Sequence, residues 1–216
     1  MSRAIEIIRF PGLVSYSHAF ALQRGRQSAV EEGRRGNALF LLEHEPVVTL
    51  GRNTRPENLL SSPEEFGKAG IALYEASRGG DVTYHGPGQL VGYPILNLTF
   101  WKPSIRWYLR TLEQVLIETL AVYDLHGERC EGFTGVWVEG AKVAAIGVGI
   151  HNWVTCHGVA LNVDPDMSHF ARIIPCGLAD KPITSLAALL GTPPPMVEVM
   201  DAFAGCFEGV FGEEEA

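Results

Sequence analysis

The sequence lacks the features that mark exported, membrane-spanning and disulfide-rich proteins. No basic stretch followed by an apolar segment opens the chain, and no apolar run approaches the roughly 20 residues that span a bilayer. We therefore expect a soluble, cytoplasmic protein without membrane contact. Cysteine is scarce and widely spaced, with no CxxC pair among Cys130, Cys156, Cys176 and Cys206. This pattern predicts free thiols in a reducing compartment and argues against a disulfide framework or a metal site.

Basic residues are also in deficit. The chain has 17 lysines and arginines against 25 acidic residues, which gives a formal net charge of -8. Such a charge repels phosphate backbones and argues against nucleic-acid binding. An acidic protein partner would need a local basic patch, for which the arginines between Arg24 and Arg35 or the basic residues between Lys102 and Arg110 are candidates. Charge runs of this kind are more often simply solvated helix faces.

The chain contains enough apolar residues for one substantial core. With 216 residues, of which 46% are hydrophobic, we expect one domain over residues 1–212 and an acidic tail over residues 213–216. Helical and strand-like patterns alternate without internal repeats, which predicts an α/β (α+β) fold with a mixed, largely antiparallel sheet flanked by helices. Strands are expected over residues 5–10, closed by Pro11-Gly12, and over 38–43, 47–50, 136–139, 142–150 and 155–163. Helices are expected from Ser15, Ser62, Ser104, Thr184 or Ser185, and Val197.

The most unusual stretch runs from Arg78 to Gln89 and holds four glycines in twelve residues. Glycine clusters allow a ligand to approach the backbone closely and leave N–H groups available for an anion or a carbonyl oxygen. The spacing matches neither a P-loop nor a dinucleotide-binding fingerprint. Two β-turns joined by an edge strand are about as consistent with the pattern as a binding loop is.

A second cluster, KVAAIG from Lys142, places a lysine at the start of an apolar strand of small residues. With a period of two, Lys142, Ala144 and Ile146 share one face of the strand. The small side chains leave room for a ligand beside the strand. Taken alone, a lysine whose stem lies along apolar surface at a hairpin end is the more common arrangement.

The third cluster is IPCG from Ile174, in which Cys176 stands between proline and glycine. A lone cysteine is usually a small buried apolar residue. Here the flanking residues predict a turn, in which the thiol can be exposed and directed. The neighbouring pair Cys156-His157 falls in an expected strand, where adjacent side chains point to opposite faces, so the two are not expected to share a metal.

Taken together, the three clusters resemble the lipoyl(octanoyl) transferase family within the biotin and lipoate protein ligase superfamily. The stretches that carry the resemblance are RGGDVTYHGPGQ from Arg78, KVAAIG from Lys142, HGVALNV from His157 and IPCG from Ile174. They occur in the family's order and extend over nearly half of the chain, whose total length is also that of the family.

The resemblance implies an acyltransferase with a catalytic pair. Cys176 would carry the acyl group as a thioester, and Lys142 would lower the pKa of that thiol and act as general base. The residues implied to bind the substrate are Arg78, Gly79, Gly80, Asp81, Val82, Thr83, Tyr84, His85, Ala145, Ile146, Gly147, Gly158, Val159 and Ala160. Asp81 and Val82 are expected to contribute only their backbone, and no metal ligand is implied.

The resemblance also implies the partners. Octanoyl-acyl carrier protein would donate the octanoyl group, and the acceptors would be lysines of lipoyl domains of 2-oxoacid dehydrogenases and of the glycine cleavage H protein. No ATP or other cofactor is expected, because exchange of one thioester for another is nearly balanced in energy and amide formation runs downhill. We expect the protein to act as a monomer.

Two other functions stay open on the sequence. A lipoate-protein ligase would share the fold and the strand lysine, but it activates a free acid with ATP and needs no catalytic cysteine. A non-catalytic acyl-binding module would use the same glycine-rich pocket and would leave Cys176 unmodified.

Overall fold

The structure is a computed structural model that describes residues 3–175 and 181–212. Cys176 and the acidic tail at residues 213–216 lie outside the described residues. The strands are β1 (Ile5–Val14), β2 (Asn37–His44), β3 (Val47–Leu50), β4 (Ala72–Glu75), β5 (Thr83–His85), β6 (Gln89–Ile95), β7 (Val136–Val138), β8 (Ala141–His151) and β9 (Val154–Asn162). The helices are α1 (Tyr16–Glu31), α2 (Pro63–Lys68), α3 (Ile105–Ala121), α4 (Leu186–Leu190) and α5 (Met196–Phe211). Within the described residues, no helix is long and apolar enough to cross a membrane.

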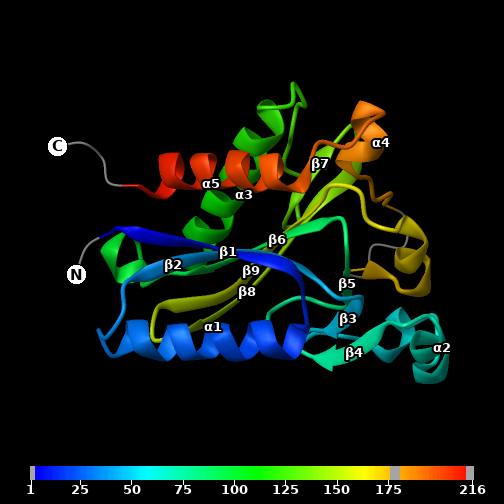
Figure 1. Cartoon of the computed structure of the whole chain (residues 1–216), viewed down its shortest axis with the longest axis horizontal. Coiled ribbons are helices and arrows are strands. Elements are labelled where there is room, and N and C mark those ends of the chain that lie inside the picture. The colour runs from blue at the N-terminus through cyan, green and yellow to red at the C-terminus, as the bar shows by residue number, and fades with distance from the viewer. Residues whose placement is uncertain (1–2, 176–180, 213–216) are drawn as a thin grey trace.

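The larger sheet has six strands in the order β1-β2-β6-β9-β8-β7, with helices on both faces. Helix α1 lies along one face, and α3 and α5 lie on the other (Figure 1). Only β1 and β2 run parallel, and the other neighbours are antiparallel. The expected α+β fold with a mixed, largely antiparallel sheet is confirmed.

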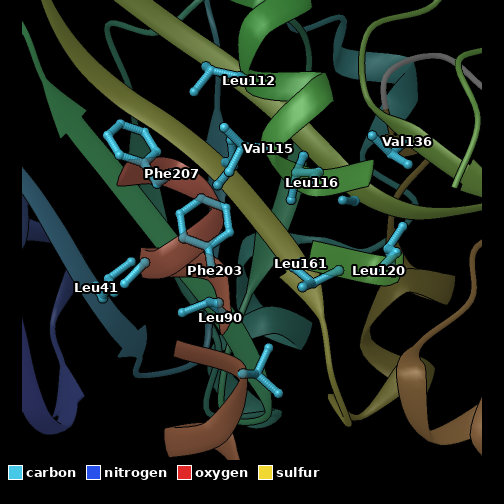
Figure 2. Packing of buried hydrophobic residues seen from close by; sticks show 14 of the residues in the cluster. Leu41, Leu90, Leu112, Val115, Leu116, Leu120, Val136, Leu161, Phe203 and Phe207 are labelled. Carbon is cyan, nitrogen blue, oxygen red and sulfur yellow. The ribbon is translucent and has the colours of Figure 1, made fainter. Parts of the chain in front are cut away.

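The main core fills the space between the six-stranded sheet and the pair α3 and α5. Figure 2 shows Leu112, Val115 and Leu116 of α3 facing Phe203 and Phe207 of α5, with side chains of β2, β6 and β9 beneath them. Strand β2 alternates its contacts, because Leu39 and Leu41 enter this core while Phe40 and Leu42 pack under α1. Both faces of β2 are therefore covered, which explains its nearly continuous apolar sequence.

A second sheet, of three strands in the order β4-β3-β5, was not predicted. It lies beside α2 (Figure 1). A satellite core of buried side chains, which contains Val48, Phe66, Val82 and Tyr84, packs in this region. Strand β5 pairs antiparallel with β3 at the edge of this sheet. The glycine-rich stretch therefore contains both turns and an edge strand, β5. Strand β5 belongs to the smaller sheet, whereas the stretch ends at Gln89, where β6 of the larger sheet begins.

Helix starts agree with the sequence, whereas the end of the first strand does not. Ser62 and Glu65 form the expected capping box, and Ser104 and Ser185 cap α3 and α4. The prediction that the first strand closes at Pro11-Gly12 is wrong, because β1 continues to Val14 through an irregularity between Arg9 and Leu13. β1 is an edge strand, so a proline can remain in it without breaking a ladder on its outer side.

Candidate active site

Three hollows meet around β8, and we name each by its position. The groove is an open depression of about 1000 Å³ that runs along β8 past the N-terminal part of α3. The Lys142 cavity is a small hollow at the start of β8. The inner pocket is narrow and lies between β8, β9 and the glycine-rich stretch. The groove shares Lys142 with the cavity and shares Gly79, Gly80, Ile146 and Gly147 with the inner pocket, so the three adjoin.

Most of the predicted substrate-binding residues come together around the inner pocket. Three separate stretches of sequence supply its walls: Arg78, Gly79, Gly80, Thr83 and His85; Ala145, Ile146 and Gly147; and Gly158, Val159 and Ala160. Strand pairing explains this, because β8 and β9 are antiparallel neighbours in which Ala145 lies opposite Ala160 and Gly147 opposite Gly158. The small residues leave the room that the sequence predicted.

The remaining three predicted residues lie elsewhere. Asp81 lines the groove, where its carboxylate accepts hydrogen bonds from the backbone N–H of Val82 and from the side chain of Asn58. The side chains of Val82 and Tyr84 are completely buried in the satellite core. For Val82 this agrees with the expectation that it contributes through its backbone.

Arg78 is held in a fixed position by β3. Its guanidinium donates hydrogen bonds to the carbonyl and the hydroxyl of Thr49, both at 2.8 Å, and to the carbonyl of Gly79 at 3.1 Å. The arginine is only 6% exposed. Gly147 lies directly beside it, and a Cβ atom there would be 3.1 Å from Arg78 Cδ. Because Gly147 has no side chain, Arg78 can pack directly over β8.

The turn after β5 needs its glycines for steric reasons. A Cβ atom on Gly86 would overlap the Tyr84 hydroxyl, and one on Gly88 would overlap the carbonyl of Asp164. Gly88 also has a positive φ of 80°, which side chains disfavour. The turn also brings His85 and Gln89 together, and His85 Nδ1 donates a hydrogen bond to Gln89 Oε1 at 2.7 Å. These glycines are therefore structural, although the stretch they belong to borders the site.

A chain of buried hydrogen bonds connects His85 to the strand that bears Lys142. Gln89 Nε2 donates to Asn162 Oδ1 at 2.9 Å, and Asn162 Nδ2 donates to the carbonyl of Thr184 at 3.0 Å. The backbone N–H of Thr184 donates to the carbonyl of Lys142 at 2.9 Å. Each amide orientation is set by its neighbours, so the glycine-rich stretch, β9 and β8 are held in one register.

Lys142 is buried, with only 7% of the residue exposed, and it lines the Lys142 cavity. Its Nζ lies 5.0 Å from the centre of the Trp137 ring, a cation–π contact. The register of β8 against β7 shifts here, because Val136 pairs with Ala144 and Trp137 with Lys142. The alternation expected along β8 is therefore interrupted at this register shift, and Lys142, Ala144 and Ala145 all line the Lys142 cavity.

The described residues on either side of Cys176 approach Lys142. Pro175, which precedes the cysteine, and Lys181 both line the Lys142 cavity. The carbonyl of Pro182 accepts a hydrogen bond from the backbone N–H of Lys142 at 2.8 Å. Cys176 itself, which follows Pro175 in the sequence, lies outside the described residues.

The inner pocket ends in a cluster of aromatic and histidine side chains that the sequence analysis did not select. Tyr16, Tyr93 and His157 complete its walls. His157 is held by Ser77 Oγ at 3.0 Å and by the Tyr16 hydroxyl at 3.3 Å. Tyr16 and Tyr93 occupy ordinary core positions of a helix and a strand, so periodicity alone carried no signal. The signal for His157 was its place at the head of the HGVALNV run.

The end of the inner pocket is electrically neutral apart from Arg78. Burial, with the charges of Arg78 and Arg52, lowers the pKa of His157 to about 3. Burial likewise lowers the pKa of His85 well below its usual value and raises that of Tyr93 well above. At neutral pH these rings are uncharged, so an apolar chain can lie against them without displacing a solvated ion.

Two further observations limit the chemistry of the site. Within residues 3–175 and 181–212, no group of three or more histidine, cysteine or acidic side chains is arranged to hold a metal. The backbone N–H of Gly79, which could have served as an oxyanion donor, already donates to the carbonyl of Val148 at 2.9 Å. Gly177, a second candidate donor, lies outside the described residues.

Comparison with known proteins identifies similar sequences and similar folds. The family model described as "Lipoyl protein ligase A/B catalytic domain" matches residues 15–208. An octanoyltransferase of Gloeobacter violaceus is 52% identical over 94% of this chain and 88% of its own length. An octanoyltransferase of Solibacter usitatus is 48% identical over 96% of this chain and 93% of its own.

Solved structures share the fold at low sequence identity. Lipoate-protein ligase A bound with ATP superposes with a TM-score of 0.76 at 15% identity, covering 97% of this chain and 85% of that one. A putative lipoate protein ligase from T. acidophilum, Ta0514, gives 0.73 at 14% identity, with 97% and 85% covered. At these identities the likeness establishes the biotin/lipoate ligase-like fold alone.

Proposed function

This chain belongs to the lipoyl protein ligase A/B catalytic domain family and is an acyltransferase that transfers octanoyl groups, and we propose that Cys176 carries the group as a thioester. The donor is octanoyl-acyl carrier protein, and the acceptor is a specific lysine of a lipoyl domain. Lys142 is the partner of the cysteine in both half-reactions. No metal, ATP or other cofactor takes part.

The observation that supports this proposal most directly is the placement of Pro175 and Lys181. Both line the same cavity as Lys142, and they are the described residues that bracket Cys176. Cys176 follows Pro175 directly in the sequence, and the Lys142 cavity shares Thr83, Ala145 and Ala160 with the inner pocket. This layout provides a nucleophile, a proton carrier and a site for an acyl chain in adjoining spaces.

In the first half-reaction the Cys176 thiolate attacks the carbonyl carbon of the octanoyl thioester. The new S–C bond forms as the S–C bond to the donor's thiol breaks, and the leaving thiolate takes a proton from the Lys142 ammonium. An unperturbed thiol, with a pKa near 8.5, is only slightly ionised at neutral pH, so a neighbouring ammonium favours the reactive form. The donor leaves as a free thiol, and Lys142 is left neutral.

In the second half-reaction the amine of the acceptor lysine attacks the Cys176 thioester. A C–N bond forms, the S–C bond to the cysteine breaks, and the proton lost by the amine passes to the neutral Lys142 as general base. Thiolate and ammonium are thereby restored for the next cycle. Because an amide is more stable than a thioester, the transfer runs downhill without ATP.

The inner pocket supplies the selection for the acyl group. Each buried CH₂ contributes about 0.8 kcal/mol, so a pocket that accepts eight carbons discriminates against much shorter chains by several kcal/mol. The residues that β8 and β9 contribute to its walls are mainly small and apolar, and Tyr16, Tyr93 and His157 also line it. Neutral rings suit the methyl terminus of a saturated chain.

The experiment that tests the proposal is intact-mass measurement after incubation with octanoyl-acyl carrier protein and no ATP. We expect one octanoyl adduct that hydroxylamine removes and that a lipoyl domain discharges. The adduct should be absent from the Cys176→Ala variant, while Cys156→Ala and Cys206→Ala should retain it. A protein that stays unmodified would rule out the thioester mechanism, and ATP-dependent release of pyrophosphate would indicate a ligase instead.

A further inference from the structure

The groove has two walls of different chemical character. One wall is apolar and carries Ile105 and Leu109 of α3 together with Phe133. Ile105 and Phe133 are 52% and 38% exposed, so this wall is open to solvent. The other wall carries Arg52 and Arg55 in the loop that follows β3. The groove volume, about 1000 Å³, is at the upper end of the range of about 300–1000 Å³ that small-molecule sites occupy.

The arginine loop is fixed against the glycine-rich stretch. The backbone N–H of Arg52 donates to the carbonyl of Arg78 at 3.1 Å, and that of Asn53 donates to the carbonyl of Gly80 at 3.1 Å. Gly51 lies so close to the carbonyl of Gly80 that a Cβ atom there would overlap it. The two arginines are therefore presented at a set position beside the mouth of the inner pocket, although their side chains are exposed.

The charges on the arginine wall are available to a ligand. Within the part of the chain that the structure describes, neither Arg52 nor Arg55 forms an ion pair. Two acidic residues share the groove, but the Asp81 carboxylate is already occupied by hydrogen bonds from Val82 and Asn58. Glu57 is the remaining carboxylate, and it is exposed. In a protein with a net charge of -8, this pair of arginines is a local exception.

We propose that Arg52 and Arg55 bind the phosphate of the phosphopantetheine arm on which the octanoyl group is delivered. The inference rests on the proposed donor. Guanidinium groups match phosphate oxygens in two-point hydrogen bonds, which an ammonium does not. The apolar wall then lies along the hydrocarbon and amide part of the arm, and the thioester reaches the Lys142 cavity, which adjoins the groove at Lys142. Charge and shape thus point to one occupant, an amphipathic chain with an anionic end.

Two small donors can be compared to measure how much the phosphate contributes to recognition. Octanoyl-4′-phosphopantetheine and octanoyl-pantetheine differ only in that group, so the ratio of their kcat/KM values for acylation reports its recognition. We expect the wild-type protein to prefer the phosphorylated donor by about tenfold or more, as charged hydrogen bonds generally allow. In Arg52→Ala and Arg55→Ala the ratio should fall toward one, mainly through KM, and in Glu57→Gln it should rise.

Arg106→Ala is the matched control, because this exposed arginine of α3 lies outside the groove lining and should leave the ratio unchanged. A variant that is merely less well folded loses rate with both donors and keeps the ratio. A wild-type ratio near one, or a ratio that survives both arginine substitutions, would overturn the inference and leave the proposed function standing. If neither donor acylates the wild-type protein while octanoyl-acyl carrier protein does, the arm alone is not recognised and the inference also fails. Failure of every donor contradicts the proposed function itself.

Discussion

Gly135 lies directly against Lys142, and the lysine occupies the space that a side chain at residue 135 would take. A Cβ atom there would be 2.8 Å from Lys142 Cε and 2.5 Å from the carbonyl oxygen of Ala144. Gly135 also has a φ of 131°, outside the range that side chains readily adopt. Gly135 belongs to none of the three sequence clusters. It nevertheless provides the space that the side chain of Lys142, the proposed proton carrier, occupies.

Replacement of this glycine should therefore damage the site as well as the fold. We expect Gly135→Ala to lower the free energy of unfolding by about 1–3 kcal/mol and to slow acylation of Cys176 at least tenfold. Gly132→Ala is the control, because its φ of 80° is also positive but a Cβ atom there would meet no neighbour. Urea denaturation and single-turnover acylation should separate the two variants. Equal loss of acylation in both would contradict the role assigned to Gly135.

The width of the inner pocket should set the preferred acyl length. Ala145→Leu adds three carbons to the wall, so the preferred donor should shift from eight carbons toward about six, at about 0.8 kcal/mol for each CH₂ excluded. Competition between donors of different length, read by intact mass, measures this shift. An unchanged octanoyl preference would count against the pocket.

Gly147→Val should act differently, although Gly147 lines the same pocket. A side chain there meets Arg78 Cδ at 3.1 Å and the carbonyl of Gly79 at 3.3 Å, so the glycine-rich stretch has to move. We expect reduced acylation with donors of every length, instead of a new length preference. A preference for shorter donors in Gly147→Val, without a loss of acylation rate, would contradict this expectation. It would show that the glycine-rich stretch can move without losing its function.

Buried histidines should make stability depend on pH. The pKa of His157 is lowered to about 3 and that of His44 to about 4, in both cases mainly by burial, from 6.5 in the unfolded chain. Between pH 6.5 and pH 4 the unfolded state binds more protons, so the free energy of unfolding must rise with pH in this window and fall as acid is added. The slope is at most about 1.4 kcal/mol per pH unit for each histidine.

Denaturation series at pH 7, 6, 5 and 4.5 test this dependence. His157→Asn should flatten the slope, because asparagine tolerates the positive φ of 58° at this position and does not titrate. Its stability at pH 7 should fall, since the contacts to Ser77 and Tyr16 are lost. A wild-type stability that stays constant from pH 6.5 to pH 4.5 would contradict the neutral, buried state of these rings.

The amide pair Gln89 and Asn162 should be needed for a well-ordered site. Asn162→Ala removes one of the two hydrogen bonds of Gln89 Nε2 and the partner of the Thr184 carbonyl, which costs about 1–3 kcal/mol for buried groups. Acylation should slow as well, because Thr184 holds the backbone of Lys142. Asn162→Asp is the matched variant, since it can accept from Gln89 but cannot donate to Thr184 as a carboxylate. Full activity in both variants, measured as single-turnover acylation, would show that this chain of hydrogen bonds is dispensable.

Much of the fold followed from local pattern. Caps such as Ser62 and Ser104 act within one turn of helix, and β8 and β9 are long, mainly apolar runs that follow each other in the chain, so both were predictable. The small sheet of β3, β4 and β5 was not predicted, because its strands are short and its pairing brings together residues distant in sequence. The register shift at Lys142 escaped prediction for the same reason, since a bulge depends on the partner strand.

The sequence by itself determined the family, the fold class and most of the residues that line the inner pocket, because these depend on residue types at characteristic spacings. Tertiary structure alone decided how they meet. It placed Tyr16 of α1 and His157 of β9 at the end of the pocket, set Gly135 against Lys142, and brought Arg52 beside Arg78. These are contacts between segments far apart in the chain, and they depend on how strands pair and pack, which no local sequence pattern encodes.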